Sequence, residues 1–126
     1  MLGHIGLTIN HKDDIKDFYK DLLGMREIKN FEIPQRISQR VFQINKSNSI
    51  TTLAKDNLVI ELFLSNKQSN PVYNHIGIYK DHRQTFIKRA KDKGYPVNII
   101  QRENKNDLIF IEDNSGNKFE IAKTPE

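Results

Sequence analysis

Histidine and glutamate, which can bind divalent metal ions without sulfur, stand at matching places in two halves of this 126-residue chain. His4 and His75 each begin the tripeptide His-Ile-Gly, which occurs at 4–6 and again at 75–77. Glu61 and Glu120 each interrupt an apolar segment late in their half. The chain has no cysteine, so a metal must be held by imidazole and carboxylate groups. Two of each could bind a hard or borderline divalent ion and leave positions for substrate oxygens.

Hydrophobic periodicity predicts the elements that carry these residues in the first half. Residues 4–10 alternate between polar and apolar, as in a half-buried strand. Asp13 or Asp14 can cap a helix that follows, and Gly24 can end it. The expected apolar stripe of this helix is Ile15, Phe18, Tyr19, Leu22 and Leu23. Strands are expected over 25–33, 37–45 and 57–64, separated by Pro34 and the polar run 45–49.

The second half repeats the pattern. A strand over 74–79 precedes a helix over 82–93 that ends at Gly94, and strands are expected at 96–102, 107–112 and 117–122. Residues 113–117 resemble part of a calcium loop but lack its other ligands, which favours a tight turn. The order β-α-β-β-β therefore occurs twice, and predicts a single domain over 1–126 made of modules 1–65 and 70–124. Ser65–Asn70 and Pro71 are the expected linker.

The same alternation predicts where the four side chains point. The apolar residues of the first strand should face the helix, so His4 should face away from it. His75, Glu61 and Glu120 likewise fall on the sheet face opposite the helix of their own module. If the two modules pair about a pseudo-twofold axis, all four residues meet in one place.

This arrangement allows two interpretations. One face of an antiparallel sheet can be wet, and polar residues there need have no function. Glu61, however, has Val59 and Phe63 as neighbours on its own face, and a carboxylate among apolar side chains is costly without a partner. Patterning alone leaves both the wet face and the metal site open.

Longer motifs add a resemblance to a known family. They are His4-Ile5-Gly6, Asp17-Phe18-Tyr19-Lys20-Asp21-Leu22-Leu23-Gly24-Met25, Ile60-Glu61-Leu62, Asn74-His75-Ile76-Gly77 and Glu112-Asp113-Asn114-Ser115-Gly116-Asn117-Lys118-Phe119-Glu120-Ile121. Over nearly its full length the chain resembles the vicinal oxygen chelate superfamily (glyoxalase, bleomycin resistance and dioxygenase proteins). The resemblance implies an α+β fold in which two tandem βαβββ modules form a cup-shaped mixed sheet with helices on the outer face.

The resemblance also implies a metal site and an assembly. It assigns His4, Glu61, His75 and Glu120 as ligands of one divalent ion, namely nickel, cobalt or zinc, with manganese and magnesium as alternatives. It implies a homodimer, because similar proteins usually pair modules between chains and so cover exposed sheet edges.

Two histidines with two glutamates are most similar to the ligand set of bacterial glyoxalase I. The implied activity is that of a lactoylglutathione lyase, an isomerase of methylglyoxal detoxification. It converts a methylglyoxal–thiol hemithioacetal to an S-2-hydroxyacyl thiol through an enediolate that the metal stabilises as a Lewis acid. By resemblance Glu120 is the catalytic base, and Glu61 could serve the opposite face of the substrate.

The chain departs from glyoxalase I at two positions. Thr8 stands where an arginine commonly holds a glutathione carboxylate, and Ser65, next to Asn66, stands where an asparagine is common. Three arginines could substitute or could be ordinary surface residues: Arg36, Arg40 and Arg102. The alternative functions are a small-ligand-binding protein of the family, for an antibiotic or metabolite, and an enzyme with another substrate, such as an epimerase or thiol transferase.

Composition argues against larger partners. The net charge is +4, but lysines alternate with acids and no aromatic residues are interleaved as a nucleic-acid stacking platform requires. The longest apolar run, Leu58–Leu64, is broken by Glu61 and is far shorter than the ~20 residues that span a bilayer. The first residues have no pattern of a signal peptide, so a cytoplasmic protein with a small-molecule substrate is expected.

Overall fold

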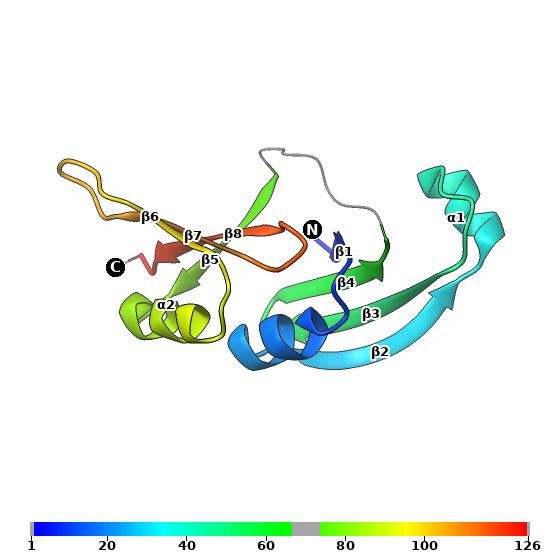
Figure 1. Cartoon of the computed structure of the whole chain (residues 1–126), viewed down its shortest axis with the longest axis horizontal. Coiled ribbons are helices and arrows are strands. Elements are labelled where there is room, and N and C mark those ends of the chain that lie inside the picture. Colours follow the sequence, from blue (N-terminus) through cyan, green and yellow to red (C-terminus); the bar gives the residue numbers. More distant parts are fainter. Residues whose placement is uncertain (1, 67–73, 126) are drawn as a thin grey trace. The chain divides into compact units, whose positions relative to one another are not determined.

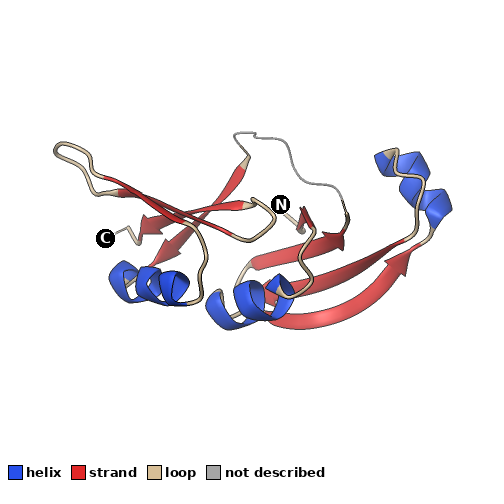
Figure 2. Cartoon of the chain, viewed as in Figure 1, coloured by secondary structure: helices blue, strands red, loops and turns tan. Residues whose placement is uncertain are grey.

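A computed structural model describes residues 2–66 and 74–125 of the chain. The chain divides into two compact units, Met1–Gln68 and Ser69–Glu126. Most of the linker predicted from sequence, Ser65–Asn70 and Pro71, lies outside the described residues. Figure 1 follows the elements of each unit in chain order, and Figure 2 separates helices from strands by colour.

The first unit holds a four-stranded mixed sheet. Its strands are β1 (Ile5–Ile9), β2 (Arg26–Ile33), β3 (Asn48–Lys55) and β4 (Leu58–Leu64), in the order β1-β4-β3-β2. β1 runs parallel to β4, and the other neighbours are antiparallel. Helix η1 (Ile15–Leu22) follows β1, and helix α1 (Gln35–Phe42) follows β2.

The second unit repeats this topology. Its strands are β5 (His75–Lys80), β6 (Val97–Ile100), β7 (Leu108–Glu112) and β8 (Lys118–Lys123), in the order β5-β8-β7-β6. β5 is parallel to β8, and helix α2 (Arg83–Asp92) follows β5. The duplication predicted from sequence is therefore confirmed in strand order and direction, and the fold is the predicted α+β pair of similar modules.

Helix η1 forms where an α-helix was predicted, but it is a π-helix, a wider helix that is rare at this length. At its end, the Leu23 N–H donates to the carbonyl oxygen of Phe18, five residues earlier, at 2.9 Å. Most of the predicted apolar stripe is buried all the same, with Phe18, Tyr19 and Leu22 at most 1% exposed, whereas Ile15 is half-buried. Asp14 occupies the N-cap position without a side-chain capping bond, and Gly24 ends the turn at a φ of 73°.

The strand predicted over 37–45 was wrong. Pro34 is extended there and starts helix α1, which is rich in glutamine and arginine, straight-chain residues that lose little rotamer freedom in a helix. The third strand lies later, at Asn48–Lys55, and begins inside the polar run that was expected to separate strands. Its Thr51 and Thr52 are β-branched and suit a central strand that is paired on both edges. The first module is therefore β-α-β-α-β-β.

The end of α1 offers a test of this correction. Gln43 has a φ of 58°, in the left-handed region that costs an ordinary side chain roughly 1–2 kcal/mol. Gln43→Gly should raise the free energy of unfolding by about 0.5–1 kcal/mol after the greater entropy of glycine in the unfolded chain is deducted. Gln39→Gly, inside the helix, should lower it by about 1 kcal/mol. Denaturant unfolding of both variants measures these changes. An unchanged free energy of unfolding in Gln39→Gly would contradict the assignment of helix α1.

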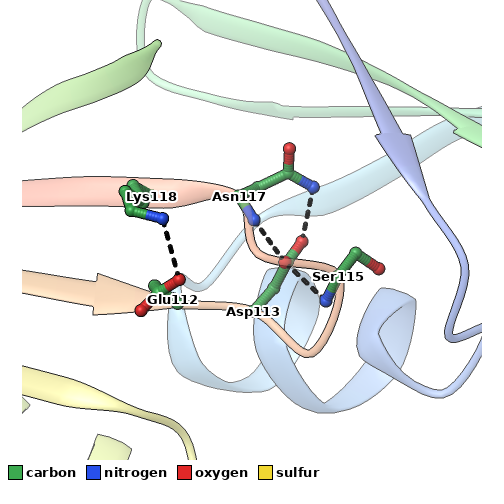
Figure 3. A network of polar contacts seen from close by, with 5 residues as sticks. All are labelled: Glu112, Asp113, Ser115, Asn117 and Lys118. Carbon is green, nitrogen blue, oxygen red and sulfur yellow. Dashed lines mark hydrogen bonds and ion pairs between the residues drawn. The ribbon is translucent and has the colours of Figure 1, made fainter. Parts of the chain in front are cut away.

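The hairpin before the last strand is held by one carboxylate, shown in Figure 3. Asp113 is 2% exposed, and its Oδ1 accepts hydrogen bonds from the backbone N–H groups of Ser115 and Asn117, each at 2.9 Å. Its Oδ2 accepts a third bond, from Asn117 Nδ2, at 2.8 Å. Lys118 and Glu112 form an ion pair at 3.0 Å across the two strands. The tight turn predicted at 113–117 is confirmed, and it leads directly into β8, which carries Glu120.

Candidate metal centre

In the first unit, strand pairing brings His4 and Glu61 together. Gly6 on β1 lies directly opposite Glu61 on β4, and His4 is two residues before Gly6, so it is on the same face. The His4 Nε2 atom is 3.1 Å from Glu61 Oε1. On β4, Ile60 and Leu62 are buried while Glu61 between them is 18% exposed at its side chain, which is the alternation that the sequence predicted.

The second unit builds its pair in the same register. Gly77 on β5 lies opposite Glu120 on β8, and His75 again precedes that glycine by two residues. The His75 Nε2 atom is 3.5 Å from Glu120 Oε1. The His75 ring also meets the edge of Phe110, the residue across from Glu120 on β7, with ring centroids 5.3 Å apart.

The repeated glycine explains how each histidine reaches its glutamate. A glycine opposite the carboxylate leaves no side chain between the glutamate and the histidine two residues away. At Gly77 an added Cβ would have no atom within 4 Å, so space is open beside Glu120. At Gly6 the added atom would come within 3.2 Å of a ring carbon of Phe63, so that side is tighter.

The spacing of each pair suits two ligands of one divalent ion. Metal bonds to histidine nitrogen and carboxylate oxygen are near 2.0–2.2 Å, so neighbouring ligands lie about 2.9–3.5 Å apart. The observed separations of 3.1 Å and 3.5 Å fall in this range. Among residues 2–66 and 74–125, no group of three or more candidate ligands is gathered. Each unit thus brings together one imidazole and one carboxylate.

One polar residue on the Glu61 face was missed in the sequence. Thr52 on β3 lies directly opposite Glu61, is 5% exposed, and has a buried hydroxyl with no hydrogen-bond partner in the described structure. A threonine in a strand is unremarkable by its type, and only the pairing of β3 with β4 places it beside the carboxylate.

The arginines considered as replacements for the missing one differ in exposure and in hydrogen bonding. The Arg102 guanidinium donates two hydrogen bonds to the Asn106 carbonyl, at 3.0 and 2.8 Å, and so holds its own loop. Arg36 and Arg40 are exposed on helix α1. Thr8 is exposed on β1, on the same strand face as His4, and the Ser65 N–H donates to the Ile9 carbonyl at 2.8 Å.

Comparison with solved structures shows relatives of the same fold. A glyoxalase family protein from Enterococcus faecalis superimposes with a TM-score of 0.73 at 16% identity, covering 96% of this chain and 95% of that one. A glyoxalase family protein from Bacillus cereus gives 0.75 at 14% identity, with 97% and 92% covered. A mutant of the fosfomycin resistance protein FosX from Listeria monocytogenes, complexed with Mn(II) and 1S,2S-dihydroxypropylphosphonic acid, gives 0.76 at 17% identity, with 99% and 92% covered.

Sequence comparison identifies the family. No curated protein sequence matches the chain significantly. Within the described residues, no helix is long and apolar enough to cross a membrane. The model of the glyoxalase/bleomycin resistance protein/dioxygenase superfamily matches residues 1–121, almost the whole chain. The resemblance seen in the sequence is thus confirmed at the level of the family, and the chain belongs to the glyoxalase/bleomycin resistance protein/dioxygenase superfamily.

Proposed function

We propose that this protein binds one divalent metal ion per set of His4, Glu61, His75 and Glu120, and isomerises the hemithioacetal of an α-oxoaldehyde and a thiol, as glyoxalase I does. The observation that carries the proposal is the equivalence of the two His–Glu pairs, each built on a parallel strand pair in the same register. Mn(II) in the structure of a FosX relative supports a divalent ion in this fold.

In this proposal the protein's own groups move one proton. A divalent ion bound there would supply Lewis-acid stabilisation of charge on the substrate's hydroxyl and carbonyl oxygens. The Glu120 carboxylate removes the proton from the carbon that carries sulfur, and the same proton is returned to the neighbouring carbon. The hydroxyl proton of the first carbon passes to the oxygen of the second, so that the first becomes the thioester carbonyl and the second carries the hydroxyl. The product is an S-2-hydroxyacyl thiol with the same atoms as the substrate. Glu61, equivalent in its strand pairing, could receive a proton on the opposite face.

The space beside Glu120 supports its role as the base. No atom lies within 4 Å of the position that a Cβ on Gly77 would take, directly opposite the carboxylate. A general base must come within hydrogen-bond reach of the proton that it removes. Glu61 faces a glycine that is crowded by Phe63. We therefore assign the base to Glu120 rather than to Glu61.

The test is metal binding followed by turnover. Metal-stripped protein should bind one equivalent of Ni²⁺, Co²⁺, Zn²⁺ or Mn²⁺ per chain in calorimetry. The loaded protein should convert methylglyoxal with glutathione, or with another thiol, to the thioester. Metal binding without thioester formation from any thiol would reject the glyoxalase activity and leave the metal site.

A second candidate activity should be tested alongside thioester formation. Thr8 stands where glyoxalase I commonly carries a glutathione-binding arginine, and FosX, a fosfomycin resistance protein, is among the structural relatives. Opening of a small phosphonate epoxide by water or by a thiol is therefore the second candidate. Product formation from such an epoxide without thioester formation would favour it over the glyoxalase reaction.

We also propose that the protein is a homodimer. β2 is an edge strand of its sheet and is almost wholly exposed, with Ile28 48% and Phe31 38% accessible. β6 is an edge strand of the other sheet and exposes Ile99 and Ile100. The unpaired backbone N–H and C=O groups of an exposed edge strand are a template for pairing with another chain. Sedimentation equilibrium at micromolar concentration should give twice the chain mass, and a monomer alone would contradict the proposal.

A further inference from the structure

Thr52 is a buried polar residue whose hydroxyl makes no hydrogen bond that would stabilise the fold. It is directly opposite Glu61 on one side and Lys29 on the other, in a row across the sheet. The residue is 5% exposed, and its hydroxyl oxygen is buried with no hydrogen-bond partner within the described part of the chain. A buried hydroxyl without a partner destabilises a fold, because its bonds to water are lost and not replaced.

The neighbouring threonine shows the ordinary situation. Thr51 points to the opposite face, where its Oγ1 accepts a hydrogen bond from Asn30 Nδ2 at 2.7 Å. That face lies toward helix η1, since Ile15 and Lys16 line a cavity together with Asn30 and Thr51. The Thr51 hydroxyl therefore forms a hydrogen bond within the unit, whereas the Thr52 hydroxyl forms none with the described residues.

Among the side chains paired with Thr52 across the sheet, Glu61 is the one that can accept a hydrogen bond. The neighbours of Thr52 on the same face of β3 are Ile50 and Ala54, which offer no polar side-chain atom. The Lys29 ammonium lies 4.9 Å from the centroid of the Phe31 ring and can only donate. Glu61 lies directly opposite, and side chains so placed have Cβ atoms about 4.5–5.5 Å apart.

The carboxylate of Glu61 has capacity for a second bond. Its Oε1 is 3.1 Å from His4 Nε2. A carboxylate has roughly four lone-pair sites, so an interaction with His4 or with a metal leaves others for a donor. In metal sites, ligating carboxylates are commonly held by such additional hydrogen bonds, which orient them toward the ion.

We propose that Thr52 is a positioning residue whose hydroxyl donates a hydrogen bond to Glu61 when His4 and Glu61 bind a divalent ion. This inference rests on the proposed metal site. It explains why a polar group is kept in a buried place where valine, of the same shape, would fold without an unsatisfied hydroxyl. Because the Thr52 oxygen is buried, its expected partner is this neighbouring side chain rather than the substrate.

The experiment uses two adjacent threonines as matched variants. Thr52→Val should weaken Mn²⁺ binding to metal-stripped protein about 10-fold or more in calorimetry, since removing such an outer hydrogen bond typically costs 10–100-fold. The thermal midpoint of the metal-free variant should equal or exceed that of the wild type. Thr52→Ser, which keeps the hydroxyl, should bind Mn²⁺ within about threefold of wild type. Thr51→Val should lower the thermal midpoint, because Asn30 loses its acceptor, without changing Mn²⁺ affinity.

A second arm tests whether the hydroxyl acts through Glu61. In a Glu61→Ala background, which removes the side-chain acceptor, Thr52→Val should cause less than a twofold further loss of Mn²⁺ affinity, because coupled residues are not additive. An undiminished loss in that background would overturn the assignment to Glu61. Wild-type affinity in Thr52→Val would overturn the inference and leave the metal site standing. A lowered thermal midpoint with unchanged Mn²⁺ affinity would show a merely structural role. A wild-type protein that binds none of the divalent ions would overturn both proposals.

Discussion

Glu120→Gln should lower thioester formation about 10²–10⁴-fold, which is the usual effect of losing a positioned base. The amide keeps a carbonyl oxygen that can still contact a metal, but it cannot accept the carbon-bound proton of the substrate. Metal affinity should therefore fall much less than turnover. Metal content and turnover measured on the same samples will separate the two effects.

His75→Ala is the matched variant for that experiment. It removes a proposed ligand outright, so metal content and turnover should fall together. The ring of His75 also contacts Phe110, and a thermal unfolding measurement will show whether the fold is kept. If Glu120→Gln keeps wild-type turnover, Glu120 is not the base, and Glu61→Gln should then show the loss.

Asp113→Ala should reduce the free energy of unfolding by about 2–4 kcal/mol, since each buried N–H left without an acceptor costs about 1–3 kcal/mol. The buried carboxylate accepts bonds from Ser115 N, Asn117 N and Asn117 Nδ2. Urea unfolding of the metal-free protein measures the effect.

Glu112→Ala is the control for the same hairpin. Glu112 and Lys118 are 31% and 40% exposed at their side chains, and an ion pair of this kind contributes at most about 1 kcal/mol. A loss at Glu112 equal to that at Asp113 would mean that the ion pair, rather than the carboxylate of the turn, holds the hairpin. Because the turn leads into β8, Asp113→Ala should also weaken metal binding through Glu120.

The local elements were predictable where one conformation fits the side chains well. Gly24 and Gly94 end their helices with φ of 73° and 84°, as their lack of a Cβ allows. The strand predicted over 37–45 was wrong because a short segment with few apolar residues fits the spacing of either a helix or a strand. Helix η1 was predicted by its apolar spacing, but an eight-residue pattern does not distinguish hydrogen bonds four residues apart from bonds five apart.

The sequence by itself determined which side chains share a sheet face, because side chains alternate along any strand whatever lies beside it. On that basis His4 and Glu61 could be assigned to one face, as could His75 and Glu120. Only the tertiary structure decided that Glu61 lies between Gly6 on β1 and Thr52 on β3. The pairing of Gly6 with Glu61 joins strands some fifty residues apart and is set by the packing of the whole unit and not by any local pattern. Thr52 reaches Glu61 across the hairpin of β3 and β4, and the sequence placed the third strand elsewhere. The role proposed for Thr52 therefore follows from the fold, whereas the choice of the two histidines and two glutamates came from the chain itself.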